Sequence, residues 1–155
     1  MSQITSRRMD DSPPELDATQ AALAAEHAAV YGYGVVGALI GDDRSREADE
    51  AYASHRARRD ALHRTVRDLG GTPVASAAAY ALPFEVPDGA AAVRLAAELE
   101  SRLAGAYVAL VGATEGDARR EAAAALREVA VRAARWSGAG TPFPGLTEDE
   151  SEGSR

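Results

Sequence analysis

The segment 71–87 constrains the fold of this chain most, because it spans 17 residues and contains Pro73, Pro83 and Pro87. It lies between two pairs of helix-forming segments, and only a few residues separate the members of each pair. Each pair is therefore expected to fold as an antiparallel helical hairpin. A connection as long as 71–87 normally crosses another part of a compact domain. The spacing predicts an all-α, antiparallel four-helix bundle with one long crossover between the second and third helices.

Capping and breaking residues place the ends of the four helices. Ser12, Pro13 and Glu15 form a start signal, since Ser suits the cap position and Pro the first helical position. Asp88 can cap the third helix, and Thr114 opens a capping-box-like pattern for the fourth. The 36 alanines also favour helices, because Ala is the strongest helix former and a poor strand residue. The predicted helices cover residues 13–40, 42–69, 88–113 and 114–136.

Length and composition indicate one folded domain with two polar ends. A chain of 155 residues has the size of one typical domain. We expect residues 1–12 to be a flexible N-terminus and residues 13–146 to form the bundle. Residues 147–155 carry four acidic side chains and no apolar one, which predicts a disordered acidic tail. Because Ala-rich faces bury little area per residue, a homodimer that covers further apolar surface is also expected.

Composition excludes several classes of chemistry and partner. The chain has no Cys and no Lys, so it has no thiolate metal site, Cys nucleophile, Lys Schiff base or phosphate-loop Lys. Residues 18–146 hold 16 acids and 14 arginines, which leaves no basic surface typical of nucleic-acid binding. The longest apolar run, 30–40, is about half of the ~20 residues that span a bilayer. With no signal peptide at residues 1–11 either, we expect a cytoplasmic protein that binds neither membrane nor nucleic acid.

Charged residues lie on the apolar faces of three predicted helices. Glu26 in the first helix and Glu100 in the third have only uncharged neighbours at helical spacing. In the second helix, His55 and Arg59 lie in the middle of an apolar stripe. An uncompensated buried charge costs several kcal/mol, so these four side chains are expected to meet near the middle of the bundle. The planar Arg59 guanidinium can bind both carboxylates and is therefore predicted to lie between them.

Two interpretations remain open for the Gly-rich part of the first helix, which contains Tyr33. Gly34, Gly37 and Gly41 recur at helical spacing and can allow tight packing against another helix, or the stretch can leave a slot for a small ligand. In the second case Glu26, Tyr33 and Tyr107 are the residues expected to line the pocket. We assign no catalytic residue, because the sequence shows no Ser-His-Asp order, phosphate loop or His cluster with metal spacing.

Five sequence patches resemble a small bacterial branch of uncharacterised ferritin-like domains. They are AAEHAAVYGYGVVGAL, AYASHRARRDAL, GGTPVASAAAYALP, LESRLAGAY, and AVRAARW followed by PFPGL. Together they cover most of residues 20–146 in order. The resemblance implies a ferritin-like bundle. In di-iron members of that superfamily the first and third helices each supply a Glu, and the second and fourth each supply Glu-x-x-His; Glu26 and Glu100 match the single Glu positions.

The chain departs from the di-iron pattern in its second and fourth helices. Neither carries an inward Glu-x-x-His, since Glu128 is followed at the third position by Val131. We therefore expect no metal cofactor; if iron or manganese binds, Glu26, His55 and Glu100 are the available ligands. The favoured hypothesis is a non-catalytic ferritin-like bundle in which a buried Glu/Arg/His cluster replaces the di-iron site. A small-molecule-binding bundle and a metal-dependent oxidoreductase with fewer ligands are the alternatives.

Overall fold

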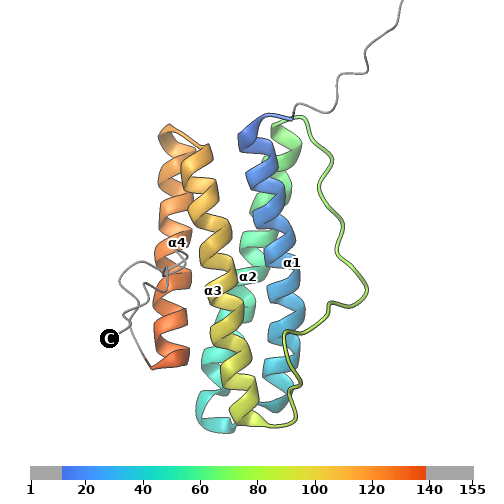
Figure 1. The fold of residues 1–155 in the computed structure, drawn as a ribbon, viewed down its shortest axis with the longest axis vertical. Helices are drawn as coiled ribbons and strands as arrows, with labels where there is room; N and C mark the ends of the chain where they lie inside the picture. Colours follow the sequence, from blue (N-terminus) through green and yellow to red (C-terminus); the bar gives the residue numbers. More distant parts are fainter. Residues whose placement is uncertain (1–11, 139–155) are drawn as a thin grey trace, which may run out of the picture.

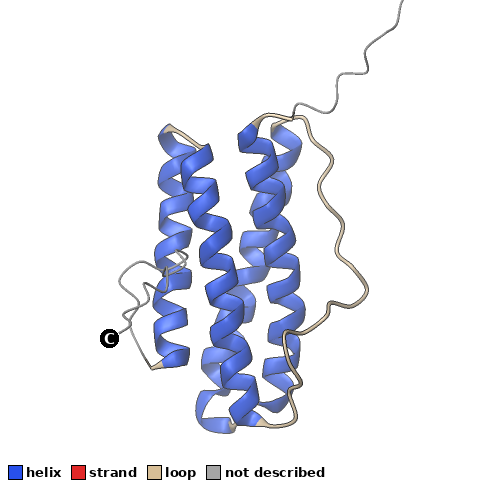
Figure 2. Cartoon of the chain, viewed as in Figure 1, coloured by secondary structure: helices blue, strands red, loops and turns tan. Residues whose placement is uncertain are grey.

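A computed structural model describes residues 12–138, which form four helices and no strand (Figure 2). The helices are α1 (Pro14–Leu39), α2 (Asp42–Asp68), α3 (Gly89–Ala113) and α4 (Gly116–Ser137). The prediction of an all-α four-helix bundle is confirmed, with helix ends within two residues of the expected ones. The predicted acidic tail at 147–155 lies outside the described residues, as does the predicted N-terminal tail apart from residue 12.

Short turns join α1 to α2 and α3 to α4, whereas the connection from α2 to α3 runs along the outside of α1 from one end of the bundle to the other (Figure 1). Helix α1 packs against both α2 and α3, and α4 packs against α3. No Cα atom of α2 lies within 8 Å of one in α4. Side chains bridge this wider separation, because Arg58 forms a 2.9 Å ion pair with Glu128 and Arg132 donates to the Ser54 hydroxyl at 2.8 Å.

The helix ends follow the local signals, but not every predicted cap forms. Ser12 does not cap α1, because Pro13 occupies the cap position and no side chain makes a cap hydrogen bond there. Asp88 caps α3, since its carboxylate accepts a hydrogen bond from the Ala91 N–H at 2.8 Å. Thr114 does not cap α4, contrary to the sequence prediction. Its hydroxyl donates instead to the Leu110 carbonyl at 2.6 Å, so it finishes α3 rather than starting α4. A Thr placed after one helix can bond back to that helix as easily as forward to the next, which explains the error.

Polar contacts hold the crossover against α1. The Gln20 side chain donates to the Thr72 carbonyl at 2.6 Å and accepts from the Val74 N–H at 2.9 Å. Further along, the rings of Tyr31 and Tyr80 lie 5.7 Å apart. The crossover is therefore fixed to the outer face of α1 and leaves the side of the bundle between α2 and α4 uncovered.

The core divides into two apolar clusters along the bundle axis. One cluster centres on Leu23, Leu62, Leu103 and Leu110, toward the end that carries the α3–α4 turn. The other contains Tyr33, Val36, Leu95, Leu99 and Trp136, toward the opposite end. Glu26, His55 and Glu100 occupy sequence positions between the two clusters and are buried, at 0%, 1% and 0% exposure. The bundle therefore carries a polar layer in the middle of its core.

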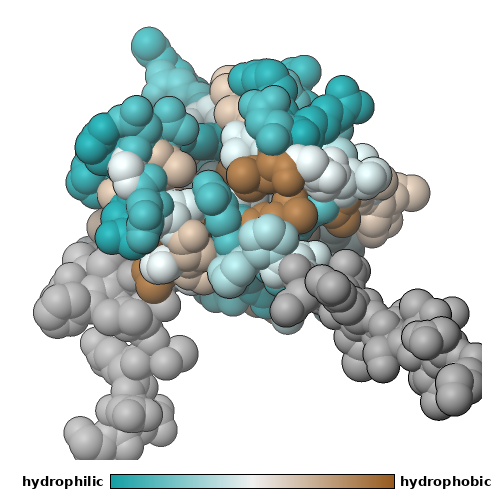
Figure 3. Space-filling view, turned by 90° about the horizontal axis from the view of Figure 1, so that it is seen from above, coloured by the Kyte–Doolittle hydropathy of each residue, from teal (hydrophilic) through white to brown (hydrophobic). Residues whose placement is uncertain are grey.

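One end of the described bundle is hydrophilic for the most part. Seen from the end with the start of α1 and the α3–α4 turn, it shows charged and polar groups around a small apolar area (Figure 3). None of the helices described for residues 12–138 combines the length and the apolar character that crossing a membrane requires.

Candidate functional site

Five buried side chains form one continuous chain of hydrogen bonds through the middle of the bundle. The Tyr107 hydroxyl donates to Glu26 Oε1 at 2.5 Å, and Glu26 Oε2 faces His55 Nδ1 at 2.8 Å. On the other side of the ring, His55 Nε2 faces Glu100 Oε1 at 2.9 Å, and the same oxygen accepts from the Tyr33 hydroxyl at 2.5 Å. We call this set, Tyr107, Glu26, His55, Glu100 and Tyr33, the polar relay.

Helices α1 and α3 each contribute one Glu and one Tyr to the polar relay. Tyr33 follows Glu26 by seven residues on α1, and Tyr107 follows Glu100 by seven residues on α3. Seven residues are two helical turns, so each Tyr projects from the same face as the Glu of its own helix. Because α1 and α3 run in opposite directions, each Tyr reaches the Glu of the other helix. The repeated Glu-x6-Tyr spacing was the sequence signal for this pairing.

His55 provides the positive charge of the polar relay. Both ring nitrogens face carboxylate oxygens, so both act as donors and the ring is an imidazolium. Burial by itself lowers the pKa of His55, but the hydrogen bonds and charges of Glu100 and Glu26 outweigh it and raise the pKa to about 9. The cation between the carboxylates is therefore an imidazolium and not the guanidinium that the sequence predicted.

Arg59 lies outside the polar relay, which corrects the sequence prediction. Its guanidinium pairs with Asp60 at 3.0 Å, and 26% of its side chain is exposed. His55 and Arg59 share one face of α2, but the shorter His side chain already fills the space between the carboxylates. The long Arg side chain reaches solvent instead, which avoids the cost of burying its charge.

The two tyrosines of the polar relay are held in the neutral form. Burial and then the negative charge of Glu100 raise the pKa of Tyr33 above its usual range. Burial and the charge of Glu26 do the same for the pKa of Tyr107, against the opposing charge of Arg58. Both hydroxyls therefore keep their protons and donate hydrogen bonds to carboxylates.

The residues present do not fit a di-iron centre. Both nitrogens of His55 are already bonded to carboxylates, so neither has a lone pair for a metal ion. Within residues 12–138 no group of three His, Asp or Glu side chains is arranged to hold a metal ion, and α4 contributes no side chain to the polar relay. One carboxylate oxygen of the polar relay is unpaired: the buried Glu100 Oε2 has no hydrogen-bond partner among the described residues.

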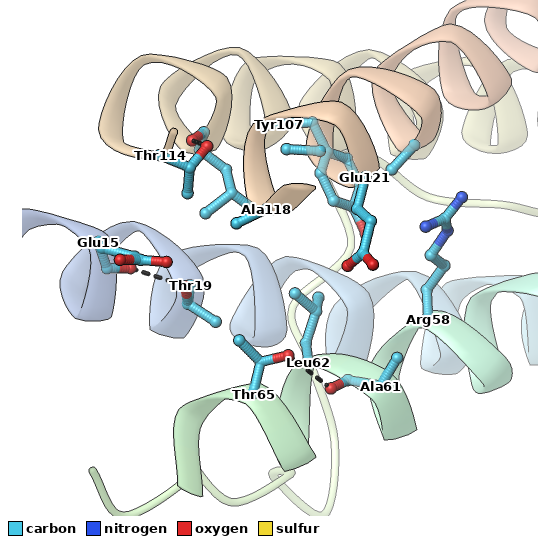
Figure 4. Close-up of a pocket in the computed structure, with 13 residues that line it drawn as sticks. Glu15, Thr19, Arg58, Ala61, Leu62, Thr65, Tyr107, Thr114, Ala118 and Glu121 are labelled. Atoms are coloured by element: carbon cyan, nitrogen blue, oxygen red, sulfur yellow. Dashed lines mark hydrogen bonds between the residues drawn. The ribbon is translucent and has the colours of Figure 1, made fainter. Parts of the chain in front are cut away.

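A cavity of about 80 Å³ lies beside one end of the polar relay (Figure 4). Tyr107 lines it, whereas Glu26 and Tyr33 do not, so the sequence-predicted pocket is only partly correct. Sequence reasoning missed the cavity because it depends on the wide separation of α2 and α4, which no local pattern encodes. We call it the α2–α4 cavity; its lining residues come from all four helices and include Glu15, Thr19, Arg58, Leu62, Thr65, Thr114, Ala118 and Glu121.

Fold and site together define an all-α four-helix bundle with a Tyr–Glu–His–Glu–Tyr chain in its core and a cavity at one end of that chain. A family model described as a domain of unknown function, DUF4439, matches residues 18–148, and the protein belongs to this family. A crystal structure of a conserved hypothetical protein from Mycobacterium tuberculosis is similar to it, with 40% sequence identity and a TM-score of 0.78. That likeness covers 81% of this chain and 89% of the other. No curated protein matches the sequence.

Proposed function

We propose that this protein is a ferritin-like bundle that binds a small molecule in the α2–α4 cavity and carries out no redox chemistry. The observation that carries the proposal is the position of Tyr107, whose ring lines the cavity while its hydroxyl is fixed by Glu26 at 2.5 Å. Binding sites are concave and mostly apolar, with a few polar groups held in fixed orientations. The α2–α4 cavity combines these properties.

The polar relay supports this function by holding the cavity wall rigid. Glu26 is fixed by the His55 imidazolium on its other oxygen, so the Tyr107 hydroxyl has a single well-defined acceptor. In the proposed ferritin-like frame, the imidazolium neutralises the carboxylates at the place where di-iron relatives hold metal. The buried charges therefore orient a binding surface and take no part in electron transfer.

Amide chemical shifts of the full chain, measured during titration with a mixture of four-carbon amines, alcohols, acids and amides, test the proposal. Shifts are expected at residues that line the cavity, such as Ala122 and Ala125. Ala118→Leu fills the cavity and should abolish the shifts. Ala124→Leu, a half-buried position of α4 outside the lining, is the matched control and should leave them unchanged. Absence of any localised shift would favour a structural or partner-binding role instead.

The unpartnered Glu100 Oε2 keeps a metal-dependent oxidoreductase as the second candidate function. Glu26, His55 and Glu100 are the side chains that could hold iron or manganese, but only if one ring nitrogen of His55 lost its proton and gave up its carboxylate partner. Equilibration of the full chain with one equivalent of Fe(II) or Mn(II), followed by desalting and metal analysis, separates the candidates. We expect no retained metal. Stoichiometric metal that is lost in Glu26→Gln would establish the second candidate.

A further inference from the structure

The hydrogen-bonding pattern of the α2–α4 cavity indicates what kind of molecule it takes. We propose that the cavity binds a primary ammonium group on a short aliphatic chain. This inference rests on the proposed function, because it names the chemical class of the ligand for the same cavity. Three independent properties of the lining carry it: the direction of its hydroxyl protons, the balance of its charges and the apolar character of its walls.

The hydroxyl groups of the lining offer only acceptors to a ligand. Thr19 donates to the Glu15 carbonyl at 2.7 Å, and Thr65 donates to the Ala61 carbonyl at 3.1 Å (Figure 4). Thr114 and Tyr107 likewise donate, to a backbone carbonyl and to Glu26 respectively. A hydroxyl has one proton and two lone pairs, so each of these four groups has already used its donor and keeps acceptor capacity.

The charged groups of the lining point to the same ligand class. The Glu15 and Glu121 carboxylates make no hydrogen bond or ion pair with the described part of the chain, and a carboxylate is an acceptor only. Figure 4 shows the Glu121 carboxylate directed toward the space between α4 and α2. Arg58, the cation of the lining, is already paired with Glu128 at 2.9 Å. The lining therefore holds two carboxylates against one guanidinium, and that guanidinium is already paired.

The remaining walls are apolar and set the size of the ligand. Leu62, Leu110 and Ala125 belong to the buried apolar cluster and also line the cavity. Its volume of about 80 Å³ suits a short aliphatic chain. An ammonium supplies three donors and no acceptor, so it complements the hydroxyl and carboxylate oxygens of this lining, whereas a carboxylate would find a donor side chain only in Arg58 and like charge in Glu15 and Glu121.

Three probes of equal length test the ligand class: n-butylammonium, n-butanol and n-butyrate, each titrated into the full chain at pH 7 and followed by amide chemical shifts. Butylammonium is expected to bind at the cavity, butanol at least threefold more weakly and butyrate not at all. If butanol or butyrate binds there as tightly as butylammonium, the cavity is a binding site but the ammonium assignment is wrong. If none of the three binds, the proposed function fails together with this inference.

Variants that remove one charge then test whether butylammonium binds at the α2–α4 cavity. Glu121→Gln should weaken butylammonium binding about threefold to fivefold, the size of a solvent-screened charge pair, and leave butanol binding unchanged. Glu98→Gln, which removes an equal charge from the exposed Arg102 pair on α3, is the matched control and should have no effect. An equal loss of butylammonium binding in both variants would show long-range attraction only and would overturn the site. Ala118→Leu should abolish binding of butylammonium, and unchanged binding would place it elsewhere.

Discussion

At the scale of single residues, His55 determines whether the core tolerates its two carboxylates. Replacing it by Leu leaves Glu26 and Glu100 buried without a cation, and removal of one partner from a buried ion pair costs about 3–5 kcal/mol. His55→Leu should therefore lower the melting temperature strongly, as measured by circular dichroism. Arg59→Leu on the same helix should cost less than about 1 kcal/mol, because its ion pair is solvent-exposed.

A rescue experiment keeps this prediction testable if His55→Leu fails to fold. Glu26→Gln and Glu100→Gln, added to His55→Leu, remove both unpaired charges and should restore part of the lost stability. If Arg59→Leu proved as damaging as His55→Leu, the placement of Arg59 at the surface would be wrong.

The same residue makes stability depend on pH. The folded-state pKa of His55, about 9, lies above the unfolded value of 6.5, so the folded protein holds its proton more tightly. The stabilising contribution is complete below pH 6.5 and is lost as the pH rises through about 9. The free energy of unfolding, measured by urea titration from about pH 6 to about pH 9.5, should fall by up to roughly 1.4 kcal/mol per pH unit in that window. In the triple variant, which has no imidazole between the two side chains, this slope should be absent.

The two tyrosine hydroxyls of the polar relay should contribute equally to the free energy of unfolding, because each donates to the Glu of the other helix. Tyr33→Phe and Tyr107→Phe each remove a donor from a buried carboxylate, and each should cost about 1–3 kcal/mol of unfolding free energy. Tyr31→Phe, whose half-exposed side chain makes a ring contact with Tyr80, is the control and should be near neutral. A cost for only one of the two buried tyrosines would contradict the reciprocal arrangement.

At the scale of the elements, the glycines of α1 behave differently from one another. A Cβ at Gly32 would lie 2.5 Å from a Leu99 methyl group, whereas one at Gly34 or Gly37 meets nothing within 4 Å. The close approach of another helix that the sequence predicted for Gly34 and Gly37 is therefore wrong, and it occurs at Gly32 instead. Gly34→Ala should stabilise the protein by about 0.5–1 kcal/mol through helix propensity, and Gly32→Ala should not. Thermal unfolding of the two variants side by side decides this.

Sequence reasoning predicted the elements well because their ends are set by local chemistry. Prolines, Asp88 and the paired glycines at 70 and 71 act within a few residues, and the observed bounds follow them. The site was predicted less completely. Periodicity identifies Glu26, His55 and Glu100 as inward-facing, but it cannot tell which of two cations on one face of α2 fills the space between them. That choice depends on side-chain length and on the distance between helices, which are tertiary properties.

At the scale of the whole molecule, we expect two chains to associate. Ala-rich helices bury little area each, and Leu39, Phe84 and Val131 remain at least 36% exposed. Sedimentation equilibrium at micromolar concentration should therefore give twice the 16.1 kDa of one chain. A mass of one chain at that concentration would refute the homodimer and leave these side chains facing solvent.

The polar relay has a consequence for how uniquely the helices fit together. Alanine faces are smooth and nearly alike from one turn to the next, so they scarcely distinguish one axial alignment of α1 and α3 from another. A slide of α1 past α3 by one turn, about 5.4 Å, would break both Tyr–Glu hydrogen bonds and at least one of the two His55–Glu bonds, and it would leave buried charges in apolar surroundings. We therefore expect the five side chains to fix the axial register of α1 and α3. They would select one packing among many that small side chains alone would leave equivalent.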